Sequence, residues 1–396
     1  MTKQVWTVER GTVPVDVTAE VQSMQYSTGR RTQFDSWSPG SLVLSIRNNS
    51  AQADSYNLND LITLTSASSG FYQWFYVQEV LFNDLGGTGA GSTATIICTD
   101  LLGRMGRIQV FEQYLDSTNT ILQLVNEFNA LMPTGSSLSG NGDGDSIAAA
   151  ETYTGTVLNR LNLNMVTEQG WLSVTDISVY LYARSKIDDL APGTIVFARQ
   201  GDGLNQMGYS DIKRITLGSN YLNTCIVIPT LAAQQNATEP TGVAAYGYYG
   251  AEFSTVDNTI QQAEDFATWQ VYSRSDPAEV SFQISVSDLN NDLDPLLGEI
   301  YANQPVVTVS YEKPGSSTDY VSAQIMQGWS MTVTPSATYM EIYTSPLTYT
   351  NFFTLDSSTF GRLGGTGVTY NSEIFYNQSD YTYNDTTADN AGRLGW

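Results

Sequence analysis

Two stretches that lie far apart in this chain share a strict alternation of apolar and polar residues. In the first stretch, the apolar residues are Leu42, Leu44 and Ile46. In the second, apolar side chains alternate with serine and glutamine through residues 280–286. Because successive side chains of a strand point to opposite faces, a period of two predicts strands with one buried face. The chain is therefore expected to be rich in half-buried strands.

The alternating strands belong to two blocks whose elements follow in the same order. Each block has a strand, a second strand, a turn and a final strand, at 41–47, 59–65, 76–81 and 93–99 in the first and at 279–286, 303–309, 320–325 and 338–344 in the second. The match extends over roughly 60–70 residues per block and predicts an internal duplication, although any two antiparallel meanders look alike. A duplication implies two small β-barrels.

The segment between the blocks has a different character. Apolar residues on one helical face predict a helix over 121–132, with Ser117 and Thr118 as caps and Pro133 at its end. The stretch 135–146 is rich in glycine and serine, which is typical of a mobile loop.

Further helices are predicted near 147–162 and 256–271, with a strand at 177–182 between them.

The first block contains a glycine-rich stretch at 83–91. This stretch lacks the spacing of a phosphate-binding loop, so we expect a hairpin loop there. Residues 15–21 also alternate and predict an early strand.

These patterns predict a β-rich α+β protein with two small antiparallel β-barrel domains flanking a mixed α/β insert, and an extended C-terminal tail. The expected parts are a first barrel at 1–110, the insert at 111–275, a second barrel at 276–350 and the tail at 351–396. Residues 353–396 have too few aliphatic side chains to build a core. We expect the tail to pack on a neighbour through Leu363, Leu394 and Trp396.

The chain has 396 residues and no histidine, which excludes several kinds of chemistry. Without an imidazole base, neither a Ser-His-Asp nor a Cys-His pair can form, and zinc and iron sites built on paired histidines are excluded. Cys98 and Cys225 can form at most one bridge, and Cys98 is expected to be a small buried apolar residue. No lysine follows a glycine, which excludes a P-loop.

The net charge is −23, from 40 acidic and 17 basic residues. So acidic a chain lacks the basic patches that neutralise phosphates, so no nucleic-acid binding is expected. The sequence has no stretch of about 18 apolar residues that would predict a membrane span, and the first residues lack a secretion signal.

The charge is unevenly distributed along the chain. Residues 1–110 carry a net charge of −2, whereas residues 111–396 carry −21. This asymmetry suggests that one end meets a partner.

With histidine absent, a carboxylate pair is the remaining route to an enzyme, but no spacing singles one out. Two acidic runs, 141–145 and 288–294, have alternating carboxylates like the start of a calcium loop. Glu151 falls one residue short of the required offset and Leu293 stands where the tight-turn glycine belongs, so we favour solvated loops. The tyrosine-rich segments 246–249 and 375–381 suit sugar stacking or, as we favour, a protein interface. We predict no catalytic, cofactor-binding or metal-binding residue.

Several short motifs occur in a recognisable order. Residues 29–48 read GRRTQFDSWSPGSLVLSIRN, with a Gly-Arg turn, an acidic residue and a strand ending in Arg-Asn. Residues 99–104 read TDLLGR and residues 328–333 read GWSMTV, while GRLG occurs at 361–364 and again at 392–395. In this order the motifs resemble those of minor tail (tail-tip hub) proteins of long, non-contractile-tailed bacteriophages.

The resemblance implies a structural virion protein at the distal end of a phage tail, and no enzyme. It implies a homotrimer whose two barrels per subunit form a ring of six similar units, which reconciles threefold with sixfold symmetry. Expected partners are the distal tail protein ring, the tape measure protein and tail fibre or other tip proteins. DNA would pass through without specific binding, and no membrane is involved.

Two alternatives stay open at the level of sequence: a receptor- or carbohydrate-binding protein of the same particle, and a carboxylate-based glycanase. If the ring exists, the acidic composition leads us to expect a negative channel that repels DNA phosphates.

Overall fold

The structure of the chain is a computed structural model. It describes residues 4–84, 91–188, 190, 193–199, 206–216, 220–275, 280–312, 315 and 319–347. The predicted tail, with its anchors Leu363, Leu394 and Trp396 and its tyrosines at 375–381, lies outside the described residues.

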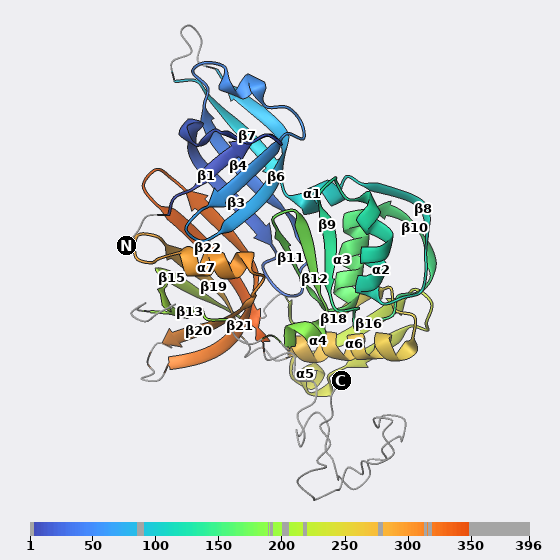
Figure 1. Cartoon of the computed structure of the whole chain (residues 1–396). Helices are drawn as coiled ribbons and strands as arrows, with labels where there is room; N and C mark the ends of the chain where they lie inside the picture. Colours follow the sequence, from blue (N-terminus) through green and yellow to red (C-terminus); the bar gives the residue numbers. More distant parts are fainter. Residues whose placement is uncertain are drawn as a thin grey trace, which may run out of the picture. The chain divides into compact units, whose positions relative to one another are not determined.

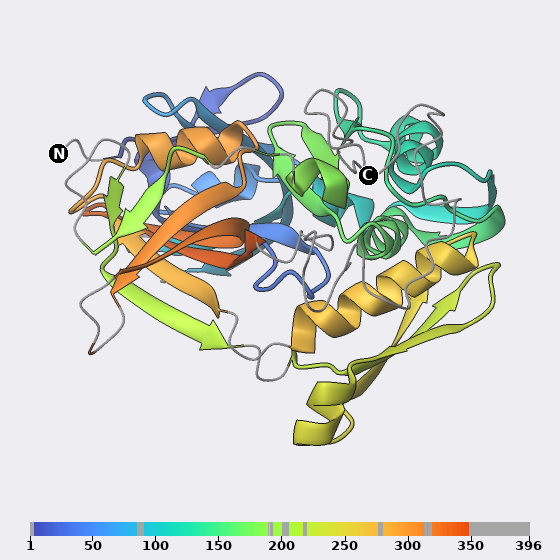
Figure 2. The same cartoon turned by 90° about the horizontal axis from the view of Figure 1, so that it is seen from below.

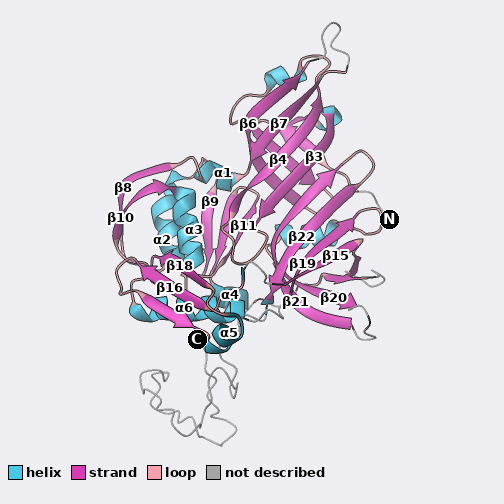
Figure 3. Ribbon diagram, turned by 180° about the vertical axis from the view of Figure 1, so that it is seen from behind, coloured by secondary structure: helices cyan, strands magenta, loops and turns pink. Residues whose placement is uncertain are grey.

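Strands dominate the described chain (Figure 3). The first block contributes β1 Thr7–Arg10, β2 Val15–Asp16, β3 Val21–Gly29, β4 Ser38–Arg47, β5 Leu61–Ser66, β6 Phe71–Asn83 and β7 Thr93–Thr99. The second contributes β13 Val196–Ala198, β14 Gln206–Gly208, β15 Asp211–Thr216, β19 Val280–Ser287, α7 Asp294–Tyr301, β20 Val306–Glu312, β21 Asp319–Val333 and β22 Thr338–Pro346. Two short 3-10 turns, Thr18–Glu20 and Gln52–Ser55, also belong to the first block.

Both blocks lie in one large sheet of fourteen strands (Figure 1). Its main path runs β14-β13-β20-β21-β3-β4-β7-β6-β5-β1-β2, and β22, β19 and β15 branch from β21. The alternating side chains of both blocks enter one core, in which Leu44 and Ile284 are both fully buried. The predicted β-rich α+β class is confirmed. The division into four parts stays a prediction, and β13, β14 and β15 come from the range assigned to the insert.

A first α/β segment follows β7. It contains α1 Leu101–Met105, β8 Gln109–Leu115, α2 Thr120–Phe128, a 3-10 turn Asn129–Leu131, β9 Ser137–Asn141, β10 Glu151–Thr156, α3 Val157–Thr167, β11 Trp171–Thr175, β12 Ser178–Tyr182 and α4 Arg184–Asp188. Helices α2 and α3 pack together and share a separate core with the β11-β12-β9 sheet.

A second α/β segment interrupts the second block between β15 and β19. It contains β16 Thr224–Pro229, β17 Gln235–Thr238, α5 Pro240–Tyr246, β18 Gly250–Thr255 and α6 Ile260–Ser275. The long helix α6 lies along the three-stranded sheet β17-β16-β18 and closes a third core (Figure 2). Within the described residues, no helix is long and apolar enough to span a membrane.

Several predicted elements are confirmed and others are wrong. The helix over 121–132 is α2 with its following 3-10 turn, but it starts after Asn119, and Ser117 instead donates its hydroxyl to the Ala148 carbonyl. The predicted loop 135–146 contains β9, which pairs in parallel with the distant strand β12. Local composition does not reveal such a partner.

The predicted helix at 147–162 begins as strand β10. The helix α3 starts only at Val157, because the Thr156 side chain accepts a hydrogen bond from the Asn159 amide at 3.1 Å and caps it there. The two predicted turns at 76–81 and 320–325 lie inside the long strands β6 and β21. The alternating segment 15–21 splits into β2, a 3-10 turn and the start of β3.

Candidate functional site: two open strand edges

The two blocks repeat one strand order. In the first, neighbouring strands run β3-β4-β7-β6-β5, and in the second they run β15-β19-β22-β21-β20. Every pair in both sets is antiparallel. A helical turn joins the second and fifth strand of each set, at Gln52–Ser55 in one and at α7 in the other. This agreement supports the predicted duplication.

A β-bulge fixes the residue correspondence between the blocks. Strand β6 is shifted against β7 at Gln78, and β21 is shifted against β22 at Gln327. Aligning these bulges places Leu81 at the position of Ser330. Pairing across β4 and β19 likewise places Ile215 of β15 at the position of Ser27 of β3.

The two blocks are joined inside the chain by antiparallel pairing of β21 with β3. The register runs from Gly328 opposite Gly29 to Val333 opposite Met24. Beneath this joint, Tyr26 packs edge-on against Trp329, with ring centroids 4.5 Å apart and an interplanar angle of 81°. Because edge-to-face aromatic pairs add to simple burial, the joint is a cohesive part of the core.

At one end of the joint, the backbones of β21 and β3 lie unusually close together. A Cβ atom on Gly328 would lie 2.6 Å from the Thr28 carbonyl oxygen and 2.7 Å from that of Arg30. Gly29 has φ +85°, in the left-handed region that favours glycine. Only two residues without side chains fit face to face here, which explains glycine at both positions.

Arg30 ties the joint to the first α/β segment. Its Nε donates to the Gln327 side chain at 2.8 Å, its Nη2 donates to the Gly170 carbonyl at 3.2 Å, and its guanidinium stacks over Trp37. Burial lowers the pKa of Arg30 to about 9, so the guanidinium stays charged at neutral pH. The Gly-Arg motif therefore has a structural role: it connects the joint to the first α/β segment, and we call Gly29 and Arg30 the Gly-Arg clamp.

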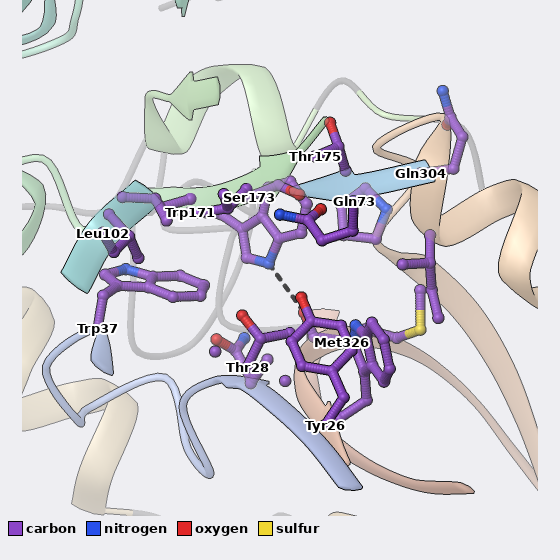
Figure 4. Close-up of a pocket in the computed structure, with 18 of the residues that line it drawn as sticks. Tyr26, Thr28, Trp37, Gln73, Leu102, Trp171, Ser173, Thr175, Gln304 and Met326 are labelled. Carbon is purple, nitrogen blue, oxygen red and sulfur yellow. Dashed lines mark hydrogen bonds between the residues drawn. The ribbon is translucent and has the colours of Figure 1, made fainter. Parts of the chain in front are cut away.

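A small cavity lies beside this clamp (Figure 4). Its walls include Tyr26, Trp37, Trp171 and Met326, and the Trp171 indole donates to the Met326 carbonyl at 2.8 Å. The cavity measures about 40 Å³, which is room for a few water molecules and far below a small-molecule site.

The TDLLGR motif starts helix α1. Asp100 is fully buried and accepts a hydrogen bond from the Gly103 amide at 3.2 Å, which makes it the helix cap. Helix α1 packs on β4, so this motif fixes the exit of the chain from the first block.

Two strand edges stay open within the described residues. After its bulge, β6 pairs with β7 on one side only, whereas the matching part of β21 pairs on both sides. Strand β15 pairs only with β19, whereas its counterpart β3 also pairs with β21. The open edges expose Leu81 by 47%, Phe82 by 49% and Ile215 by 42%. Exposed apolar edges of this kind are templates for strand addition.

Aspartates of the two acidic runs accept hydrogen bonds within the fold. Asp145 accepts from the Ser185 amide and hydroxyl, Asp288 accepts from the Thr338 amide, and Asp294 accepts from the Ser68 hydroxyl. Within the described residues, no group of three acidic or cysteine side chains is placed to hold a metal ion.

The tyrosines of 246–249 are exposed, and Tyr246 and Tyr249 both pack edge-on against Tyr221. The buried Asn223 amide holds this turn by bonding the Gly247 carbonyl and the Tyr249 amide. Such a fixed tyrosine surface suits an interface.

Cys98 and Cys225 are buried free thiols in different cores, as expected for Cys98.

Three buried carboxyls predict a pH-dependent stability. Burial raises the pKa of Asp100 to about 7, of Glu168 to about 8 and of Asp257 to about 6. Between pH 4 and these values, the native protein holds protons that the unfolded chain has released, so stability falls as the pH rises. We expect the free energy of unfolding in urea to be at least about 2 kcal/mol lower at pH 8 than at pH 5. The Glu168→Gln variant should show a smaller difference, and a stability that rises over this range would contradict the prediction.

No family model matches the sequence, and no curated protein matches it. Solved structures of tail proteins do match the fold. A tail protein from Neisseria meningitidis is 12% identical with a TM-score of 0.60, over 87% of this chain and 97% of that one. The 43 kDa tail protein of prophage MuSo2 from Shewanella oneidensis is 13% identical with a TM-score of 0.57, over 88% and 98%. The prophage tail protein gp18 from Listeria monocytogenes is 10% identical with a TM-score of 0.51, over 87% and 94%. The fold is therefore shared with phage tail proteins, as the resemblance of the sequence predicts.

Proposed function

We propose that this chain is a structural, non-enzymatic component of a phage tail that forms the homotrimeric hub at the distal tip. In this role it links the sixfold distal tail ring to threefold tip components and surrounds part of the channel for DNA ejection. The fold shared with tail proteins supports the tail role, and the open edges support the ring. The distal tail protein, the tape measure protein and tail fibre or other tip proteins are the proposed partners.

We infer the trimer from one observation: the open edges of β6 and β15 correspond to the two strands, β21 and β3, that pair at the internal joint. The joint pairs Ser330 with Ser27, so the same geometry between two copies pairs Leu81 of one with Ile215 of the next. It also places Phe82 opposite Arg214. Two exposed apolar side chains then cover each other, and a cation meets an aromatic ring.

Strand order permits such a ring to close. Within one chain, β15-β19-β22-β21-β3-β4-β7-β6 form an unbroken antiparallel series of eight strands. Because eight is even, β6 of one copy meets β15 of the next in antiparallel orientation, as β21 meets β3. This head-to-tail contact closes when the rotation per copy is one third of a turn, and closure removes every open edge of the series.

A pair of engineered cysteines tests this contact directly. Residues opposite each other on antiparallel strands have Cα atoms about 4.5–5.5 Å apart, which suits a disulfide. Oxidised Leu81→Cys/Ile215→Cys protein should run on a non-reducing gel as a ladder that ends at the trimer. The matched control, Ser27→Cys/Ser330→Cys, should form its disulfide within one chain and stay at monomer mass. A double variant that remains monomeric while the control oxidises would contradict the proposed contact.

A further inference from the structure

The eight-strand series has two unlike faces. One face carries the large core and is covered by β5, β20 and α7, through residues such as Ile62, Val307 and Leu297. The other face is open to solvent. Most of its side chains are short hydroxyl and amide groups, namely Ser23, Gln25, Ser27, Ser41, Ser45, Thr93, Thr95, Gln283, Ser285, Ser330 and Thr332, and apolar or aromatic side chains stand among them at Val43, Leu81, Ile97, Ile215, Tyr339 and Tyr343. None of these side chains is buried. We call this the hydroxyl face.

The hydroxyl face is continuous across the internal joint. Ser27 of β3 lies opposite Ser41 on one side and Ser330 on the other, and Gln25 lies opposite Thr332. Paired residues of a sheet point to the same face, so these polar side chains form one surface over several strands.

The hydroxyl face is nearly free of charge, in a chain of net charge −23. Its charged residues are Arg47, Glu79, Asp211, Lys213 and Glu341, which almost balance. Arg47 ends its strand, and three of the others lie on the edge strands β6 and β15. Only Glu341 stands among the central strands, where it accepts a hydrogen bond from Tyr343 at 3.2 Å.

Ring geometry decides which face points inward. Three copies contribute twenty-four strands, and at a spacing of about 4.8 Å and a tilt of about 40° these enclose a backbone radius of about 24 Å. A second layer packed about 10 Å inside would leave too little space for the helices and the remaining strands of three chains. The covered face must therefore point outward and the hydroxyl face inward.

We propose, building on the trimeric ring proposed above, that the hydroxyl face is the wall of the channel and that double-stranded DNA passes along it without ionic contacts. Basic walls hold DNA by releasing its counterions, and acidic walls repel it. A nearly uncharged wall, made mostly of serine, threonine and glutamine with some apolar and tyrosine side chains, does neither. This wall replaces the negative channel that the composition led us to expect, because the acidic surplus does not lie on this face.

Spin labels test the orientation of the face. A label on Ser27→Cys reacts at one site only, since both native cysteines are buried. In the trimer, three labels that point into the channel should lie about 30–35 Å apart by pulsed electron resonance, less than the roughly 42 Å between equivalent backbone positions at the radius above. The matched control Ser254→Cys, exposed on β18 of the second α/β segment, should give longer distances. A trimer whose Ser27 labels are as far apart as those at Ser254 would overturn the proposal.

Engineered charge tests the neutrality of the wall. Wild-type trimer should retain no duplex DNA in a filter assay at low salt, whereas Ser27→Lys trimer should retain it and lose it as salt rises. Ser254→Lys should behave as wild type. Salt-dependent retention by the wild-type trimer would overturn the neutral wall. A chain that stays monomeric throughout would instead contradict the proposed hub itself, so the two failures are distinguishable.

Discussion

Replacing Leu81 with aspartate is expected to leave the chain folded and to weaken the trimer. The side chain is 47% exposed in the single chain, so the substitution costs little there. In the ring Leu81 takes the position of Ser330, on the solvent-facing side of the sheet beside Ile215 of the next copy, so an aspartate there replaces an apolar cross-strand contact with a charge facing an apolar side chain. We expect each contact to weaken by about 1 kcal/mol and the trimer, with three such contacts, by about 3 kcal/mol, which is roughly 100-fold in its dissociation constant.

Light scattering at micromolar concentration measures this effect, with circular dichroism to confirm folding. Ile215→Asp should act in the same way from the other side of the contact. Leu58→Asp is the control, because Leu58 is 63% exposed but lies outside both open edges. A Leu81→Asp protein that dissociates over the same concentration range as wild type would show that the copies meet elsewhere.

Replacing Gly328 with alanine is expected to destabilise the monomer itself. The added Cβ would lie 2.6–2.8 Å from backbone atoms of Thr28 and Arg30, which no rotation of a side chain can relieve. The strands of the joint would have to separate above the packed rings of Tyr26 and Trp329. We expect a loss of about 3–5 kcal/mol, at the upper end of overpacking effects.

Urea unfolding monitored by tryptophan fluorescence gives the required free energy. Gly250→Ala is the control, since a Cβ there meets its nearest neighbour, the Thr224 carbonyl oxygen, at 3.7 Å. This control should change stability by less than about 1 kcal/mol. A Gly328→Ala variant as stable as the control would mean that the joint is looser than its geometry indicates.

The repeated strands could be predicted because each carries its own local signal. Residues such as Leu44 and Ile284 alternate with polar neighbours, and the structure buries both in the same core. Thr156, which caps α3, is also a local signal. The predicted helix at 147–162 nevertheless includes the residues of β10, because the sequence pattern does not show where the strand ends and the helix begins. Local patterns therefore define which elements exist better than where they end.

The pairings that matter for assembly could not be predicted, because their partners are remote in sequence. Strand β21 meets β3 across most of the chain, and β15 is separated from β19 by the whole second α/β segment. The open edge of β6 can be recognised in the sequence. Val80, Leu81 and Phe82 are consecutive apolar residues, which breaks the alternation of a half-buried strand and is consistent with a contact along the strand edge.

In the proposed hub, two pseudo-equivalent blocks per chain close into a threefold ring. Light scattering of the purified chain, combined with negative-stain imaging of the same sample, tests this ring most directly. We expect a mass of about 130 kDa, three times the 43.3 kDa of one chain, and ring-shaped particles with a central hole and six similar lobes. A stable monomer or dimer at micromolar concentration, or a trimer without a central hole, would contradict it.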